Sequence, residues 1–378
     1  MKRMWMILLA ALLLLSGCQR PEDASILPAQ ARLTPCAAEL GGSTYYLQGR
    51  TILVWDRAED AFVPLCRDPG CDHKGPQCAA FVDTKDAFAR FLAAAEGSLW
   101  FVSAAGESMG LYRMDPASLQ RTLVYTLPPV EDLPGAEVTV GYQFLDTCVA
   151  VDVEPMYSFN ASYLQTPEAS RVQKIMLLDL ETGALSQPFA ELLAEPFHGI
   201  YPRITRLTHS GAYLLFERTT AVWDEEAHSE VVTSEIIRWN IKTGKYRAVP
   251  LEPDAADLCL TASKAFYVQS GGSFVELDLP SGRKKTIPCA LPQPLFAKYD
   301  EAGILLYLEA APDDALRTYG FFDRSYHLLD QIRVPQALRP MLNLEDRIFF
   351  GTGDDTITAY LDKSAIGSGE LKLIGTGP

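Results

Sequence analysis

The chain has 378 residues, of which 48% are hydrophobic, and it carries a formal net charge of −15 at pH 7. This length and composition are sufficient for a packed core. An acidic surface repels phosphate backbones and anionic lipid headgroups, so nucleic acid and anionic membrane surfaces are disfavoured as partners. Peptides, glycans and cations are compatible with this charge.

The first segment has the features of an export signal. Lys2 and Arg3 precede an almost wholly apolar run over residues 4–15, which is too short to span a bilayer as a stable helix. This pattern predicts a removable signal peptide over residues 1–17. No later segment of the sequence is apolar over a length that would span a membrane.

The signal ends in Leu15-Ser16-Gly17-Cys18, which resembles the signal of bacterial lipoproteins. The resemblance implies that Cys18 is acylated, so that lipid anchors the protein to the cell membrane on the outside of the cytoplasm. An ordinary signal peptide with an unmodified cysteine is the alternative. Residues 18–35 are rich in proline, alanine and polar side chains, and we expect them to supply the lipidated cysteine and a flexible tether.

From residue 36 to residue 378, one unit of roughly 40–60 residues recurs. Each unit begins with two apolar strands joined by a tight turn, as at residues 91–95 and 99–102, and continues with a third and a fourth strand. The third strand often ends in Asp-x-x-(Ser/Thr)-Gly, as at residues 179–183. A four-stranded unit cannot bury both faces alone, so it must stack on copies of itself. The repeat predicts one all-β domain, a β-propeller, with seven four-stranded blades as the preferred number. Six or eight blades, or an irregular double sandwich, are the alternatives.

Long insertions fall at positions that share one face of such a ring. Blade three carries residues 152–171 between its second and third strands, blade four carries residues 218–234 at the same position, and residues 66–78 lead from blade one to blade two. Loops on a rigid scaffold often carry binding sites, and aromatic residues interleaved with polar ones are typical of contact surfaces. The predicted ligand-binding rim comprises Tyr157, Phe159, Tyr163, Trp223, Asp224, Glu226 and His228. Variable decoration without a ligand is the alternative.

Cys66, Cys71, His73 and Cys78 lie within thirteen residues, with the spacing Cys-x4-Cys-x-His-x4-Cys. Zinc takes four such ligands tetrahedrally, so a structural zinc ion is one interpretation. Disulfide bonds are a second interpretation, because exported cysteines often pair, and free thiols with His73 as a surface residue are the third. Seven cysteines remain besides Cys18, and an odd number cannot be paired completely. Four protein ligands would close the site, so a catalytic metal is not expected.

The segment Leu65-Cys66-Arg67-Asp68-Pro69-Gly70-Cys71-Asp72-His73 resembles a stretch in uncharacterised propeller-like lipoproteins of Gram-positive gut bacteria. The resemblance covers the N-terminal third best, and the remainder matches only in the style of its repeat. It implies the location and the fold. It implies no activity.

No catalytic residue is predicted, because no nucleophile elbow, phosphate loop or His-Glu-x-x-His helix is present in the sequence. The sequence favours a binding or assembly module that presents its rim loops to a protein, peptide or glycan. The alternative is an extracytoplasmic carbohydrate-active hydrolase or lyase with acids around the propeller channel. Several carboxylates converging at the channel mouth, with perturbed pKa values, would distinguish the two.

Overall fold

The computed structural model describes residues 36–376 except 85–90, 130–136, 146, 157–171, 195–201, 225–228, 262, 270–272, 288–293, 301–304, 311–314, 324, 345 and 354–355. The predicted signal peptide (1–17) and the segment 18–35 with Cys18 lie outside the described residues. Among the helices of the described part, none is long and apolar enough to cross a membrane.

The described strands form seven four-stranded antiparallel sheets, and within each sheet the strands lie side by side in chain order. The first four sheets account for residues 37–250. Sheet one contains β1 (Ala37–Leu40), β2 (Ser43–Gln48), β3 (Thr51–Asp56) and β4 (Ala61–Pro64); sheet two contains β5 (Leu92–Ala95), β6 (Ser98–Ala105), β7 (Ser108–Met114) and β8 (Arg121–Thr126). Sheet three contains β9 (Glu137–Leu145), β10 (Cys148–Met156), β11 (Lys174–Asp179) and β12 (Leu185–Ser186); sheet four contains β13 (Arg203–Ser210), β14 (Tyr213–Asp224), β15 (Ser229–Asn240) and β16 (Tyr246–Pro250).

The other three sheets follow the same plan. Sheet five contains β17 (Ala256–Leu260), β18 (Lys264–Gln269), β19 (Ser273–Asp278) and β20 (Lys284–Ile287); sheet six contains β21 (Pro294–Asp300), β22 (Leu305–Ala310), β23 (Leu316–Phe322) and β24 (Leu328–Pro335); sheet seven contains β25 (Arg339–Asn343), β26 (Arg347–Gly351), β27 (Ile357–Asp362) and β28 (Ile374–Gly375). Two short helical segments connect strands, namely α3 (Ala190–Ala194) and the 3₁₀ turn η4 (Lys363–Ala365).

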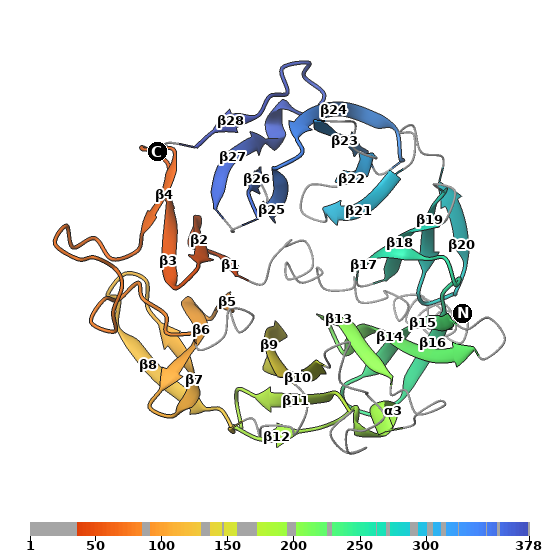
Figure 1. Ribbon diagram of the computed structural model, residues 1–378, viewed down its shortest axis with the longest axis horizontal. Coiled ribbons are helices and arrows are strands. Elements are labelled where there is room, and N and C mark those ends of the chain that lie inside the picture. Colours follow the sequence, from red (N-terminus) through yellow and green to blue (C-terminus); the bar gives the residue numbers. More distant parts are fainter. Residues whose placement is uncertain are drawn as a thin grey trace, which may run out of the picture.

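The sheets stand around a common centre, with the first strand of each innermost and the fourth outermost (Figure 1). This arrangement confirms the predicted all-β propeller. The two faces of each sheet are covered by its neighbours in the ring, which is why the middle strands are apolar on both sides. In β3, for example, Ile52, Leu53, Val54 and Trp55 are all buried.

The repeated Asp-x-x-(Ser/Thr)-Gly motif is the turn between the third and the fourth strand. After β11, the Asp179 carboxylate accepts the backbone N–H of Thr182 at 2.7 Å, and Gly183 donates its N–H to the Asp179 carbonyl at 2.9 Å. Gly183 has a φ of 70°, in the left-handed region that glycine adopts without steric cost. The same turn follows β15 and β19, where Asn240 with Gly244 and Asp278 with Gly282 take these places.

The ring closes between sheet one and sheet seven by packing of side chains, because each of these sheets consists of consecutive strands and neither lends a strand to the other. The Trp55 ring lies 5.0 Å from Phe349 and 5.6 Å from Tyr360 between centroids, in edge contacts. The Tyr360 hydroxyl donates to Asp60 at 2.8 Å, and the Gln48 amide donates to Thr356 at 3.2 Å. These contacts join the two ends of the domain.

The predicted insertion over residues 218–234 is not an irregular loop. β13 pairs with β14 only up to Thr219, and β16 pairs with β15 only from Glu235 onward, whereas β14 and β15 pair with each other out to Asp224 and Ser229. The strands therefore extend beyond sheet four as a two-stranded ribbon, comprising Thr220–Asp224 and Ser229–Thr233. The sequence at this point is rich in threonine, valine and tryptophan, which are typical of strands.

Only some of the rim residues predicted from the sequence lie among the described residues. Trp223 and Asp224 lie at the end of β14, on the ribbon. Residues 152–156, predicted as the start of the blade-three insertion, belong instead to strand β10. Tyr157, Phe159, Tyr163, Glu226 and His228 lie outside the described residues.

Candidate metal centre

The segment between β4 and β5 folds back onto sheet one. Ile52 donates its backbone N–H to Ala80 at 2.8 Å, and Val82 donates to Arg50 at 2.7 Å. Thr51 and Phe81 form an isolated antiparallel bridge. Residues 80–82 are thereby held against the start of β3, which leaves residues 66–78 as a closed loop at the edge of the ring.

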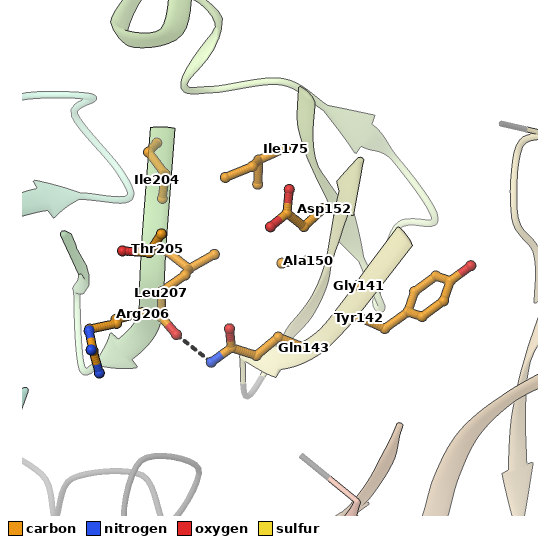
Figure 2. A pocket seen from close by; sticks show the side chains of 10 residues that line it. All are labelled: Gly141, Tyr142, Gln143, Ala150, Asp152, Ile175, Ile204, Thr205, Arg206 and Leu207. Carbon is orange, nitrogen blue, oxygen red and sulfur yellow. Dashed lines mark hydrogen bonds between the residues drawn. The ribbon is translucent and has the colours of Figure 1, made fainter. Parts of the chain in front are cut away.

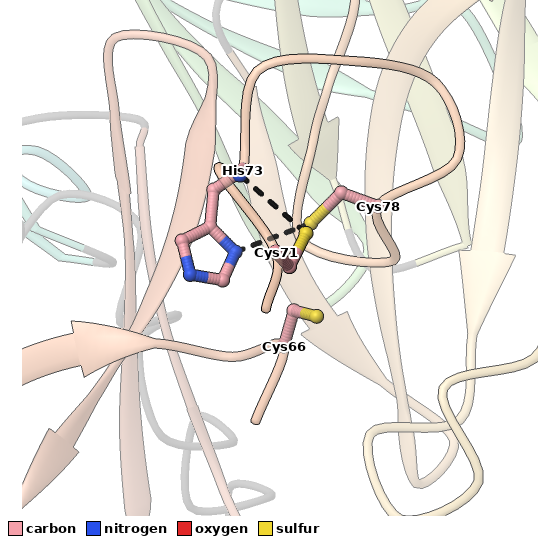
Figure 3. A group of neighbouring side chains, drawn as sticks. All are labelled: Cys66, Cys71, His73 and Cys78. Atoms are coloured by element: carbon pink, nitrogen blue, oxygen red, sulfur yellow. Dashed lines mark hydrogen bonds between the residues drawn. The ribbon is translucent and has the colours of Figure 1, made fainter. Parts of the chain in front are cut away.

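Within this loop the side chains of Cys66, Cys71, His73 and Cys78 converge (Figure 3). Their candidate ligand atoms all lie within 4.8 Å of one another. His73 Nδ1 lies 3.4 Å from Cys78 Sγ. Tetrahedral zinc with Zn–S bonds of about 2.3 Å and Zn–N bonds of about 2.0 Å places its ligand atoms roughly 3.5–3.8 Å apart. The four atoms are therefore gathered to nearly the dimensions of a zinc site.

Local turns bring the ligands together. The Asp68 carboxylate accepts the backbone N–H of Gly70 at 2.9 Å, and Cys71 donates its N–H to the Asp68 carbonyl at 3.1 Å. This is the Pro-Gly turn over residues 68–71, and it returns Cys71 toward Cys66. His73 has a φ of 57°, which is left-handed backbone that is uncommon outside glycine but that histidine, asparagine and aspartate adopt more often than other residues. This conformation turns the chain so that the imidazole lies beside the thiols (Figure 3).

Each of the three sulfur atoms accepts a hydrogen bond from the backbone of the residue two positions further along the chain. His73 N donates to Cys71 Sγ at 3.4 Å, and Ala80 N donates to Cys78 Sγ at 3.3 Å. The backbone of Asp68 hydrogen-bonds Cys66 and is the largest cause that holds the pKa of Cys66 below its ordinary value. Hydrogen bonds of this kind stabilise the thiolate, which is the form that binds metal.

The three thiols differ in their electrostatics when no cation is present. Burial raises the pKa of Cys78 to about 11, with smaller contributions from the neighbouring Cys66 and Cys71. A buried thiol alone is a poor anion, whereas a coordinated one is deprotonated outright because the metal charge offsets desolvation. The donor set, three sulfurs and one imidazole, suits zinc. This cluster can hold such an ion, which is one of the interpretations that the spacing left open.

Cys66, Cys71 and Cys78 are free thiols in this structure. Metal and disulfide remain competing predictions for these cysteines, and both are consistent with sulfur atoms this close together.

The residue that anchors the loop was not predicted from the sequence. Arg121, at the start of β8, donates through Nη2 to the backbone carbonyls of Cys78, Ala79 and Phe81. Its guanidinium lies 5.1 Å from the centre of the Phe101 ring. An arginine in sheet two thus ties the last ligand of the cluster to the next blade. Nothing in the local sequence around Arg121 marks this role, since its partners are about 40 residues away.

The carboxyl groups with perturbed pKa values bear on the enzyme alternative. Among the described carboxyl groups, Asp152 in β10 has a raised pKa, of about 6, caused first by burial. The prediction for a hydrolase or lyase was that several such groups converge, and a second described carboxyl with a raised pKa is not found beside Asp152.

Comparison with known proteins supports the fold. The scan against models of protein families found no match, and the search of curated proteins found none either. Among solved structures, an oligogalacturonate lyase in complex with manganese is similar over 89% of this chain and 85% of its own, with 12% identity and a TM-score of 0.51. BamB from Moraxella catarrhalis matches over 86% and 83% with 11% identity and a TM-score of 0.42.

A match to TolB from Acinetobacter baumannii, with 14% identity and a TM-score of 0.35, covers 64% of this chain and 52% of TolB, so the chain spans about half the length of that protein. At such identities the likeness concerns the fold alone. The ring of four-stranded sheets, a fold shared with the oligogalacturonate lyase, defines the class: the chain is a β-propeller protein.

Proposed function

We propose that this protein is a lipid-anchored, extracytoplasmic β-propeller that acts as a binding or assembly module for a protein, peptide or glycan, and that zinc holds its loop at residues 66–78. The observation that carries the binding role is the ribbon of β14 and β15. It extends beyond the supported part of sheet four, and Val231 and Val232 on it are 42% and 48% exposed. Isolated two-stranded ribbons are only marginally stable in water, so one that exposes adjacent valines is suited to gain stability by docking.

The candidate metal centre supports the same function. In a propeller, the turn between strands two and three lies on the same face as the connection to the next blade. The ribbon and the loop at residues 66–78 therefore share one rim. Four protein ligands around zinc leave no open position for substrate, so the ion would stabilise a loop on this rim. Oligogalacturonate lyase shares the fold, but no observation on this chain's described residues favours a lyase reaction.

The metal is tested first by elemental analysis of the full chain purified without added metal or chelator. We expect about one zinc ion per chain, which is lost in Cys71→Ser and in His73→Ala. Cys148→Ser, which changes a half-buried thiol in β10 away from the cluster, is the matched control and should keep the ion. If no metal is found and the mass is two hydrogens below that of the reduced chain, the loop is held by a disulfide bond and the zinc proposal is wrong.

The binding role is tested by capture of partners from envelope extracts with the immobilised full chain. The double variant Val231→Ser/Val232→Ser should lose at least one partner that the unaltered protein retains, because the apolar contact of the ribbon is removed. The control is Leu328→Ser/Leu329→Ser, which alters an equally exposed apolar pair on the outermost strand β24. Identical capture by the two double variants and the unaltered protein would refute the role of the ribbon.

A further inference from the structure

A cavity of about 130 Å³ lies between sheet three and sheet four, and none of its lining residues belongs to the candidate metal centre or to the ribbon. Figure 2 shows it between β9 and β10 on one side and β13 on the other, with the Asp152 carboxyl and the Gln143 amide turned inward and Tyr142 turned away. The cavity is lined by Gly141, Tyr142, Gln143, Ala150, Asp152, Ile175, Ile204, Thr205, Arg206 and Leu207.

One wall is shaped by an irregularity in β13. The register between β13 and β14 shifts between Thr205 and Thr208, and Arg206 within this bulge has a φ of 54°. Bulges redirect side chains and are frequent beside binding sites. Strained backbone of this kind persists where the surroundings fix it. Here the bulge opens the space that faces Asp152.

A buried amide holds the Asp152 carboxyl in place. Gln173 is 3% exposed, and its Nε2 donates to Asp152 Oδ1 at 2.8 Å and to the Ile204 carbonyl at 3.0 Å. Its Oε1 accepts the N–H of Ile204 at 2.7 Å. Gln173 thus connects sheet three to sheet four and orients one oxygen of Asp152, while the carboxyl group faces the cavity (Figure 2).

The guanidinium groups near this carboxyl form ion pairs with other carboxylates. Arg203 pairs with Glu154, and Arg206 pairs with Glu217 at 3.1 Å and also donates to the Leu258 carbonyl at 2.7 Å. Arg203 attracts the Asp152 charge and Glu154 repels it, but Asp152 has no ion-pair partner of its own among the described residues.

The polar atoms that the cavity presents are acceptors. The Gln143 amide nitrogen donates to the Leu207 carbonyl, and the Thr205 hydroxyl donates to Glu217 at 3.1 Å. These donors are already engaged by the protein. No described residue donates to Asp152 Oδ2 or to Gln143 Oε1, so a ligand here must supply donors. A primary ammonium supplies three donors, no acceptor and a positive charge.

We propose that this cavity binds an ammonium group carried on an aliphatic chain, as in the lysine side chain of a peptide or in a free polyamine. The ammonium would donate to Asp152 and Gln143, and its methylene groups would lie against Ala150, Ile175, Ile204 and Leu207. A cavity of about 150 Å³ accommodates a six-carbon ring, so this one has room for a butylammonium-sized group. The site goes beyond the proposed function and depends on neither the zinc ion nor the ribbon.

Proton linkage supports the assignment. Burial raises the pKa of Asp152 to about 6, and an ammonium binds the ionised form. The charged groups facing it are Glu154 on the same strand, Arg203 and Arg206 on β13, and Glu217 on β14. Glu154 is paired with Arg203, and Glu217 is paired with Arg206. The pH dependence of ammonium binding should therefore follow the ionisation of Asp152. Affinity for the ammonium should increase as the pH rises through about 6.

The test is titration of the full chain, by calorimetry or by ligand-observed magnetic resonance, with n-butylammonium and with n-butanol as its uncharged counterpart. We expect saturable binding of n-butylammonium, in the millimolar range, and none of n-butanol. Asp152→Asn should weaken binding at least tenfold, and Glu181→Gln, which removes an exposed acid in a turn of the same sheet, should leave it unchanged. Ala150→Val should also weaken binding, because it fills the cavity without altering its charge.

Two further ligands distinguish the natural sources. Tighter binding of Nα-acetyl-lysine methylamide than of putrescine would assign the site to a lysine side chain, and the reverse order would assign it to a free polyamine. Asp152→Glu keeps the charge and should retain binding within a few-fold. Equal binding of n-butanol, or full affinity in a folded Asp152→Asn variant, would overturn the proposal while leaving the metal and ribbon experiments untouched.

Discussion

Replacing Trp55 with alanine should lower the free energy of unfolding by about 3–5 kcal/mol, the usual cost of removing a large buried aromatic side chain. Trp55 is 6% exposed, and its ring contacts Phe62, Phe349 and Tyr360 with centroids 5.0, 5.0 and 5.6 Å away. Phe62 belongs to sheet one, whereas Phe349 and Tyr360 belong to sheet seven. The change therefore removes packing from the joint at which the ring closes, where no shared strand compensates for the loss.

Urea denaturation followed by fluorescence and circular dichroism measures this effect. Tyr246→Ala is the control, because Tyr246 also contacts another aromatic ring, stacked on Trp239 in sheet four, yet it is 49% exposed. It should cost less than about 1 kcal/mol. In a double-mutant cycle, Trp55 and Phe349 should show a coupling of about 0.5–1.5 kcal/mol. A Trp55→Ala variant as stable as the Tyr246→Ala variant would mean that the aromatic cluster does not hold the ring closed.

Asp152 should make the protein less stable as the pH rises from about 4 to about 6. Its carboxyl has a pKa of about 6 in the folded chain, against an ordinary value of 3.8, and burial is the main cause. Between these values the folded state holds a proton that the unfolded state has released, so each pH unit costs about 1.4 kcal/mol. The stabilisation is fully present below pH 4 and is lost above pH 6. The accumulated loss is on the order of 2–3 kcal/mol.

Asp152→Asn tests this directly. Asparagine keeps an oxygen for the Gln173 amide but cannot ionise, so the variant should match the unaltered protein near pH 4 and exceed its stability at pH 7. Thermal unfolding at both pH values measures the difference. Asp115→Asn is a control of opposite sign, since a backbone N–H from Ala117 lowers the pKa of Asp115. That variant should lose stability relative to the unaltered protein as the pH rises through the acid range. A pH-independent difference for Asp152→Asn would contradict the raised pKa.

The local features of this fold were predictable because they depend on neighbouring residues. The hairpin turns, such as Glu96-Gly97, and the Asp-x-x-(Ser/Thr)-Gly turns follow from the conformational freedom of glycine and from short side chains that accept backbone N–H groups. Repetition of these signals along the chain then predicts stacking, since one unit cannot bury its own faces. The candidate ligands Cys66, Cys71, His73 and Cys78 were predictable for the same reason, as they lie in one short segment joined by a Pro-Gly turn.

The insertions show where local reasoning fails. A polar, β-branched stretch between two strands is equally consistent with a loop and with an extension of both strands. The pairing of β14 with β15 out to Asp224 and Ser229 shows that it is a ribbon. Likewise, Gln173 and Arg121 are ordinary polar residues in the sequence. Their importance comes from carbonyl and carboxyl groups 21 to 43 residues away that the fold brings to them.

The repeated hairpins, the all-β class and the cluster of thiols and imidazole could be predicted, because each depends on short-range spacing and on burial patterns along the strand. The closure of the ring, the arginine that anchors the loop at residues 66–78, and the carboxyl group that faces a cavity between sheets three and four became visible only in the folded structure. Tyr360 and Asp60 are 300 residues apart in the chain. Contacts of this kind are determined by the curvature and stacking of whole sheets, and no local pattern specifies them.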